Sequence, residues 1–278
     1  MMRAVVADEV RTYAAGQQTR LHEEWREIAA SGHLLWNLVH RDLTVRYKRS
    51  VLGFFWTMLH PLMLTIILTI VFSNVFRFTL PHYETYVLAA LLPWNFFAQT
   101  TVGGMTGLAW NGPLMKRVRV PRSIFALSTV LSGLFNLALS YIPLLAIMLI
   151  RGVPLRPAIL FLPVAVVIFS IFIYGMTLAF SAIAVYFIDV REMYTVALTA
   201  LLYLTPVIYP RDIIPSRFAV LLRLNPLTYF IDLVRTPVHA GVMPSTHVIA
   251  ISSIAALLSL VIGWTIFRRL SRGFYPYL

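Results

Sequence analysis

The sequence predicts an all-α integral membrane protein that crosses the bilayer several times. Of its 278 residues, 59% are hydrophobic and 12% are charged, whereas ordinary soluble domains have about 25% charged residues. Long apolar stretches alternate with short segments that hold most of the Lys and Arg residues. This combination is typical of transmembrane helices joined by short loops.

Six apolar segments carry this prediction. We place them at about 54–76, 86–110, 123–150, 158–187, 193–209 and 246–267. At about 1.5 Å of rise per residue each can cross about 30 Å of hydrocarbon, although the fifth is barely long enough. Residues 1–33 are mixed and polar, without the apolar core of a signal peptide, so we expect a cytoplasmic extension there and a transmembrane domain over 34–278.

The positive charges predict the orientation of these segments. An even number of crossings places both termini on the same side of the membrane. Of the 23 Lys and Arg residues, sixteen lie on that side and seven on the other. The positive-inside rule therefore predicts that both termini are cytoplasmic. The same distribution explains the net charge of +12 without nucleic-acid binding, because the basic residues form no face that could read bases.

The segment before the first crossing is predicted to be an amphipathic helix over 34–49. Its apolar stripe holds Leu35, Leu38, Val39, Leu43 and Tyr47, and its opposite face holds Asn37, Arg41, Thr44 and Lys48. Such a helix fits the membrane interface, with its apolar face among the acyl chains. A surface helix that docks on a protein core is the alternative. The charged residues that would serve an interface helix are Arg41, Asp42, Arg46, Lys48 and Arg49.

Residues 210–244 form the most unusual segment, and we predict that it is re-entrant. It contains two short apolar pieces separated by Asn225 and Pro226. Asn at the N-cap and Pro at the first helical position favour a helix start. Each piece is too short to span a bilayer, so a helix pair that enters the outer leaflet and returns is the preferred interpretation. An ordinary extracellular amphipathic hairpin is the alternative.

Several kinds of chemistry are absent from the sequence. No Gly is followed by Lys, so a GxxxxGK[ST] phosphate-binding loop is missing, and there is no GxSxG nucleophile motif. Cys is absent, and the seven His residues lack metal-ligand spacing. No acidic residue lies at mid-depth of a predicted crossing, as a proton relay would require. We therefore expect no catalytic site, metal or cofactor in this chain, and an energy source elsewhere.

Small residues indicate where helices can approach closely. Gly103 and Gly107 form a GxxxG pair in the second predicted crossing, and Gly175 and Ala179 repeat the spacing in the fourth. Because this pattern is common in membrane helices, it permits a dimer without establishing one.

Three motifs resemble those of one protein family. They are RDLTVRYKRSVLGFFWTMLHPL at Arg41–Leu62, TPVIYP at Thr205–Pro210 and LNPLTYFIDLVR at Leu224–Arg235. In this order they closely resemble the membrane subunit of ABC-2 type polysaccharide exporters, the permeases for O-antigen, capsule and teichoic acid. The resemblance extends from about Leu34 to the end of the chain.

The resemblance implies an assembly and a set of functional residues. It implies a homodimer in the bacterial inner membrane, bound on the cytoplasmic side to two ATPase subunits that hold ATP and Mg, and export of a lipid-linked glycan. Contacts with the ATPase would involve Lys116, Arg117, Arg119 and Arg122, with Asp189, Arg191 and Glu192 as a second site. The gate would involve Asn225, Pro226, Tyr229, Asp232 and Arg235.

Aromatic residues are the candidates for glycan contact, because sugar C–H faces pack on rings. Those near the expected path are Trp56, Trp94, Phe96, Phe97, Tyr203 and Tyr209. An anchoring role at the membrane interfaces is the alternative for each of them. The alternative functions are export of a drug or a simple lipid by an ABC-2 exporter and, in a different class, a membrane-embedded glycan-modifying transferase. The identity of the glycan and of its lipid anchor is left open.

Overall fold

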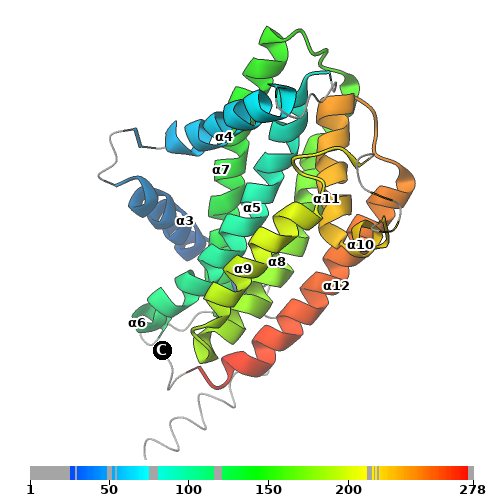
Figure 1. The fold of residues 1–278 in the computed structure, drawn as a ribbon. Helices are drawn as coiled ribbons and strands as arrows, with labels where there is room; N and C mark the ends of the chain where they lie inside the picture. Colours follow the sequence, from blue (N-terminus) through cyan, green and yellow to red (C-terminus); the bar gives the residue numbers. More distant parts are fainter. Residues whose placement is uncertain are drawn as a thin grey trace, which may run out of the picture.

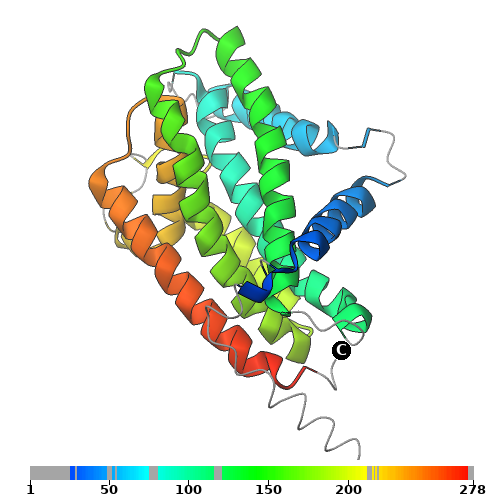
Figure 2. The ribbon, with the colours of Figure 1, turned by 180° about the vertical axis from the view of Figure 1, so that it is seen from behind.

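The computed structural model describes residues 26–28, 30–48, 52–53, 55–74, 81–115, 121–211, 215, 217 and 219–274. Every regular element within these ranges is helical, as predicted. Four long helices form a bundle, namely α5 (Tyr83–Trp110), α7 (Ser123–Ile150), α8 (Leu162–Tyr186) and α12 (Thr246–Ser271) (Figures 1 and 2). We name its two ends by residues. The Arg151 end is where α7 leads into α8, and the Asp189 end is where α8 leads into α9.

Helix α5 lies at the centre of the bundle, packed between α7 and α8, and α12 packs along α8. The contact between α8 and α12 depends on two glycines. A Cβ on Gly263 would lie 1.9 Å from the carbonyl oxygen of Gly175, and a Cβ on Gly175 would overlap the backbone of Ser259. Gly175 therefore serves packing within the chain, because Gly175 and Gly263 let the backbones of α8 and α12 approach this closely.

The shorter elements gather around this bundle. Helix η1 (Pro157–Phe161) leads into α8, and α9 (Val190–Leu204) runs back from the Asp189 end against α5 and α8. Helices α10 (Ala219–Leu224) and α11 (Pro226–Arg235) and the π-helical turn η4 (Thr236–Ala240) follow. A stack of rings anchors α11 to the core, since the centroid of Phe230 lies 4.9 Å from that of Phe169 and 4.5 Å from that of Phe172.

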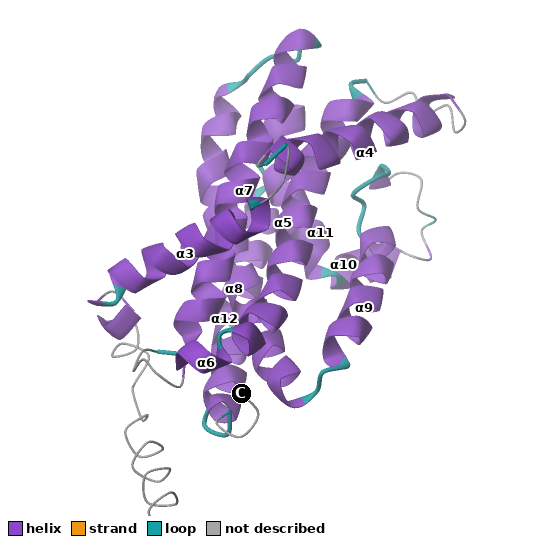
Figure 3. Cartoon of the chain, turned by 90° about the vertical axis from the view of Figure 1, so that its left-hand side faces the viewer, coloured by secondary structure: helices purple, strands orange, loops and turns teal. Residues whose placement is uncertain are grey.

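Two helices near the start of the chain cover one side of the bundle. Helix α3 (Gly32–Tyr47) packs against α7, and α4 (Phe55–Asn74) lies across α5 and α7 (Figure 3). The short α6 (Gly112–Met115) follows α5. In the predicted apolar stripe of the first helix Leu38 and Val39 are buried and Leu35 and Leu43 are half-buried, whereas Arg41, Thr44 and Lys48 of the opposite face are exposed. The side chain of Tyr47 lies outside the described residues. Helix α3 packs on α7, and its place at the membrane interface stays a prediction.

Three helices are long and apolar enough to cross a membrane in the part of the chain that the structure describes. They are α7, η1 together with α8 (Pro157–Tyr186), and α12. The six-crossing count stays a prediction. The fifth predicted crossing, 193–209, was misplaced, because α9 is 15 residues long and ends at Leu204. It measures about 22 Å at 1.5 Å per residue, short of the hydrocarbon thickness of about 30 Å.

Candidate functional site

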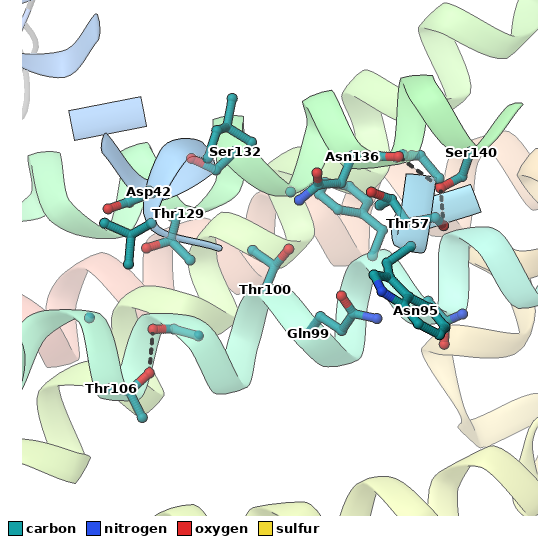
Figure 4. A pocket seen from close by; sticks show the side chains of 18 of the residues that line it. Asp42, Thr57, Asn95, Gln99, Thr100, Thr106, Thr129, Ser132, Asn136 and Ser140 are labelled. Atoms are coloured by element: carbon teal, nitrogen blue, oxygen red, sulfur yellow. Dashed lines mark hydrogen bonds between the residues drawn. The ribbon is translucent and has the colours of Figure 1, made fainter. Parts of the chain in front are cut away.

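The principal cavity of the described chain lies between α3 and α4 on one side and α5 and α7 on the other. Its volume is about 1030 Å³. One face of α5 lines it, with Asn95, Phe96, Gln99, Thr100, Gly103, Thr106 and Gly107 at helical spacing. One face of α7 forms the second wall, with Thr129, Ser132, Gly133, Asn136 and Ser140 (Figure 4). Two helices of the bundle thus turn a polar stripe toward the same space.

These two walls are polar but uncharged. Helix α7 contains no Asp, Glu, Lys or Arg, and α5 contains only Glu84, in its first turn. The polar side chains of the two walls are carboxamides and hydroxyls, which both donate and accept hydrogen bonds. Asn95 and Gln99 are one helical turn apart on α5, and Asn136 lies on α7 (Figure 4). This chemistry suits a ligand rich in hydroxyl groups.

Three polar atoms of the walls are buried without a hydrogen-bond partner, namely Asn95 Nδ2, Thr100 Oγ1 and Ser132 Oγ. A buried polar group without a partner costs roughly 1 to 3 kcal/mol, so such groups call for an explanation. For Thr100 the explanation is partly its packing between the helices. Its hydroxyl on α5 occupies the space that a Cβ of Gly133 on α7 would fill. Ser140, in contrast, is paired, since its hydroxyl lies 2.8 Å from the Asn136 carbonyl oxygen and 3.2 Å from that of Thr57 on α4.

Charged residues line the cavity only toward the Asp189 end. Arg41 of α3 forms an ion pair of 2.8 Å with Asp42 and donates to Asn111 Oδ1 at 2.7 Å. Arg191 of α9 also lines this part. The guanidinium of Arg41 therefore ties α3 to the residue that follows α5.

The six aromatic candidates from the sequence separate into three groups. Trp56 and Phe96 line the cavity. Trp94 and Phe97 lie on the other side of α5, buried and in edge-to-face contact at 5.9 Å between centroids. Tyr203 and Tyr209 lie beyond the cavity near the end of α9, where the Tyr209 hydroxyl donates to the Tyr203 carbonyl oxygen. The structure thus brings two of the six into the cavity.

A second polar cluster joins α11 to α5 at the Arg151 end. Asp232 is paired with Arg235, at 2.7 Å from Nη2, and with Arg211. Arg235 also donates to the Pro206 carbonyl oxygen at 2.8 Å, and its guanidinium lies 4.3 Å from the ring centroid of Tyr86. We call Arg211, Asp232, Arg235 and Tyr86 the Asp232 cluster. Asp232 and Arg235 are buried, and both are paired. This pairing offsets the cost of removing their charges from water.

The predicted helix start at Asn225 and Pro226 is confirmed. The side-chain oxygen of Asn225 accepts from the Leu227 N–H at 3.0 Å, and Pro226 is the first residue of α11. The amide of Asn225 also donates to Thr205 Oγ1 at 2.8 Å. Tyr229 donates to the Arg223 carbonyl oxygen at 3.2 Å, so its hydroxyl connects α11 to α10.

A histidine lies next to the Asp232 cluster, and its pKa is below the usual value for this side chain. His239 of η4 lies 5.2 Å from the ring of Tyr86, edge to face, and its Nδ1 is 3.1 Å from Thr85 Oγ1. Burial lowers the pKa of His239, and the nearby Arg235 charge lowers it further.

The residues implied in ATPase contact lie at or near the Asp189 end where they are described. Asp189, Arg191 and Glu192 are exposed around the start of α9. Arg122 is half-buried, donates to the Ser271 carbonyl oxygen and lies 5.8 Å from the Phe274 ring, so it joins α7 to the end of α12. Lys116, Arg117, Arg119 and Arg49 lie outside the described residues, as does the side chain of Arg46.

The polar residues of the two walls were not among the predicted site residues, which are charged, aromatic or part of the Asn225–Pro226 helix start. A signal was present, because Asn95 and Gln99, and Ser132, Asn136 and Ser140, recur four residues apart within apolar runs. Polar side chains at that spacing share one helix face. No group of three or more potential metal ligands occurs among the described residues.

The fold and the cavity define a helical membrane protein with a polar path beside its bundle. The ABC-2 type transporter family matches residues 33–238, and the chain belongs to this family. It is the membrane component of a transporter, a permease and not an enzyme, as the resemblance of the three motifs predicted.

Relatives of the chain are named for polysaccharide transport. An O-antigen export system permease protein RfbA of Klebsiella pneumoniae is 28% identical over 244 residues, which cover 87% of this chain and 93% of the relative. The RfbA of Myxococcus xanthus is 34% identical over 209 residues, covering 73% and 78%. The polysialic acid transport protein KpsM of Escherichia coli is 23% identical over 232 residues, covering 82% and 90%.

Proposed function

We propose that this chain is the membrane subunit of an ATP-driven exporter that moves a lipid-linked polysaccharide across the bacterial inner membrane. The cavity carries the proposal, because its walls combine carboxamides and hydroxyls with the rings of Trp56 and Phe96. A polysaccharide presents hydroxyl groups and apolar C–H faces, and these walls offer partners for both. The names of the relatives support the same class of cargo.

The exporter acts as a homodimer with two cytoplasmic ATPase subunits. The sequence supports an external ATPase because it lacks a phosphate-binding loop. Each subunit crosses the membrane six times with both termini in the cytoplasm, and the fifth crossing is made by α9 together with the buried non-helical residues Thr205–Val207 that follow it. The Asp189 end, with Arg122 and Asp189 to Glu192, faces the ATPase, and the re-entrant segment over 210–244 shapes the outer mouth. The burial of α11 against α5, α8 and α12 supports a short helix held inside the membrane domain.

Deletion of the gene tests the transport function. Cells without this chain are expected to lose the glycan from their surface and to accumulate it inside, and the wild-type gene is expected to restore it. Surface glycan is measured by lectin or antibody binding, and internal glycan by extraction of the inner membrane. Normal surface glycan with increased sensitivity to a drug would contradict the proposal and indicate the ABC-2 drug exporter. Loss of one terminal modification alone would indicate a transferase.

The topology has its own test, because the chain has no native Cys. Single Cys residues at Arg156 and at Arg272, both exposed, mark the two ends of the bundle. We expect an impermeant thiol reagent to label position 156 in intact spheroplasts and position 272 only after lysis. Labelling of position 272 from outside would overturn the six-crossing arrangement.

The ATPase contact is tested by charge reversal. Replacing Arg117 and Arg119 together by Glu is expected to leave a folded permease that no longer retains its ATPase, because charges at such a contact set recognition and register. Arg156→Glu, at the Arg151 end, is the control. ATPase co-purification and surface glycan are compared at equal membrane abundance. Retained ATPase and normal export would remove both residues from the contact, and lost insertion would identify them as lipid anchors.

A further inference from the structure

We propose that Tyr83 and Tyr86 of α5 are positioning residues of the outer mouth, and that their hydroxyls hold the segment Thr205–Tyr209 in the closed position of the resting permease. The inference rests on the proposed function, in which the re-entrant segment over 210–244 shapes that mouth. Thr205–Tyr209 connects α9 to this re-entrant segment, and it makes up all but the last residue of the TPVIYP motif.

The backbone of this segment is buried without being helical. Helix α9 ends at Leu204, and Thr205, Pro206 and Val207 are buried although they belong to no helix. The Val207 N–H donates to the Thr205 carbonyl oxygen at 2.7 Å, which closes a tight turn. Buried backbone outside a helix has neither helical partners nor water, so its remaining polar groups need donors and acceptors from other parts of the protein.

The first turn of α5 supplies two of these donors. The Tyr83 hydroxyl donates to the Ile208 carbonyl oxygen at 2.7 Å, and the Tyr86 hydroxyl donates to the Tyr209 carbonyl oxygen at 3.2 Å. The two tyrosines are more than 120 positions away from these acceptors in the sequence. The segment therefore keeps its course only while it is in contact with α5.

The two tyrosines are themselves fixed in place. Both are buried, and their rings are stacked with centroids 6.5 Å apart. The ring of Tyr86 also lies 4.3 Å from the guanidinium of Arg235, which donates to the Pro206 carbonyl oxygen at 2.8 Å. Tyr86 and Arg235 thus support each other while each binds the backbone of the same segment.

The kind of bond decides which contacts can be released during transport. These contacts lie at the Arg151 end, because Glu84, next to Tyr83, is paired with Arg151. A hydrogen bond between a neutral hydroxyl and a carbonyl contributes modestly to stability, whereas breaking the buried pair of Asp232 and Arg235 is costly. The tyrosine contacts are therefore the part of the mouth that can break when the cargo passes and form again afterwards.

The test removes the two hydroxyls and nothing else. In the double variant Tyr83→Phe, Tyr86→Phe the ring at position 86 stays against Arg235. Entry of o-nitrophenyl galactoside is measured in intact cells that lack a galactoside transporter, as its hydrolysis by β-galactosidase in the cytoplasm. We expect the double variant, expressed with its ATPase, to raise the entry rate about tenfold over the wild type, the factor that corresponds to about 1.4 kcal/mol.

A second double variant is the control for lost stability. Tyr186→Phe, Tyr194→Phe also removes two bonded hydroxyls, which donate to the Leu270 carbonyl oxygen at 2.7 Å and to Thr101 Oγ1 at 3.0 Å. Its thermal unfolding midpoint is expected to fall about as far as that of the first variant. Entry of the galactoside is expected to stay within twofold of the wild type. The strains are compared at equal membrane abundance.

Two results would overturn the role of the tyrosines. One is a wild-type entry rate in the Tyr83→Phe, Tyr86→Phe strain, and the other is an equal rise in both double variants, which would trace the leak to lost stability. Should the first variant not accumulate in the membrane, Tyr86→Phe alone decides, and a wild-type entry rate would again overturn the proposal. Entry rates require no glycan, so normal surface glycan in the deletion strain would end the export function and leave this result to be read separately.

Discussion

The two buried polar regions of this molecule differ in how their polar groups are satisfied. In the Asp232 cluster the charged groups are partnered, since Asp232 binds two arginines and Arg235 also reaches Pro206 and Tyr86. On the α5 and α7 walls of the cavity the polar groups are neutral, and Asn95 Nδ2, Thr100 Oγ1 and Ser132 Oγ have no partner in the described chain. A network that is complete within the chain holds the fold together, whereas an incomplete one is available to a ligand. This difference predicts opposite responses to mutation.

The largest effect on stability is expected from Asp232→Leu. The change leaves Arg235 buried and Arg211 without its carboxylate, and breaking a buried pair typically costs about 3 to 5 kcal/mol. Thermal unfolding of the purified permease in detergent should show a much lower midpoint. The double variant Asp232→Leu, Arg235→Met should recover part of the loss, because it removes the uncompensated charge. An unchanged midpoint for Asp232→Leu would show that the cluster does not hold α11.

The next largest effect is expected from Asn225→Ala. It removes the cap of α11 and the hydrogen bond to Thr205, and a lost N-cap costs about 0.5 to 2 kcal/mol. The unfolding midpoint should fall by less than in Asp232→Leu. Asn225→Asp is the control, since it keeps the capping oxygen. If the Ala and Asp variants have the same unfolding midpoint, the cap makes no measurable contribution to stability.

A smaller effect is expected at the ion pair between Glu84 and Arg151. The two groups are 2.8 Å apart, but Arg151 is 58% exposed, so solvent screens the pair. Exposed pairs contribute about 0 to 1 kcal/mol, and Glu84→Gln should lower the midpoint by at most a few degrees. The shift should diminish further in high salt. A loss as large as that of Asp232→Leu would mean that exposure does not distinguish the two pairs.

The smallest effect on stability is expected from Ser132→Ala. Its hydroxyl has no partner, so removing it relieves a desolvation cost, and the midpoint should stay or rise slightly. Ser128→Ala, which breaks a hydrogen bond to Phe125, should lower it. The comparison between the two regions fails if Ser132→Ala destabilises the protein more than Ser128→Ala does.

Parts of the fold and of the site were predictable because they depend on local sequence. The start of α11 follows from Asn225 and Pro226, which act on the first turn of their own helix. The bounds of α7, Ser123–Ile150, coincide with the apolar run, because apolar length sets where such a helix begins and ends. The fifth apolar run was not predicted correctly, since its last residues, from Thr205 to Tyr209, leave the helix. Val207 N–H instead binds the Thr205 carbonyl oxygen, and the carbonyls of Ile208 and Tyr209 accept from Tyr83 and Tyr86.

By itself, the sequence determined the helical class, most helix positions and the membership of an exporter family, because these follow from apolar length, local capping and contiguous motifs. The tertiary structure alone decided that Trp56 and Phe96 face a cavity while Trp94 and Phe97 enter the core. It also decided that Asp232 meets Arg211, and that the polar faces of α5 and α7 are turned toward each other. The reason is physical. Helical periodicity places residues on a face of their own helix, but the rotation of one helix against its neighbours is set by packing among segments far apart in the chain.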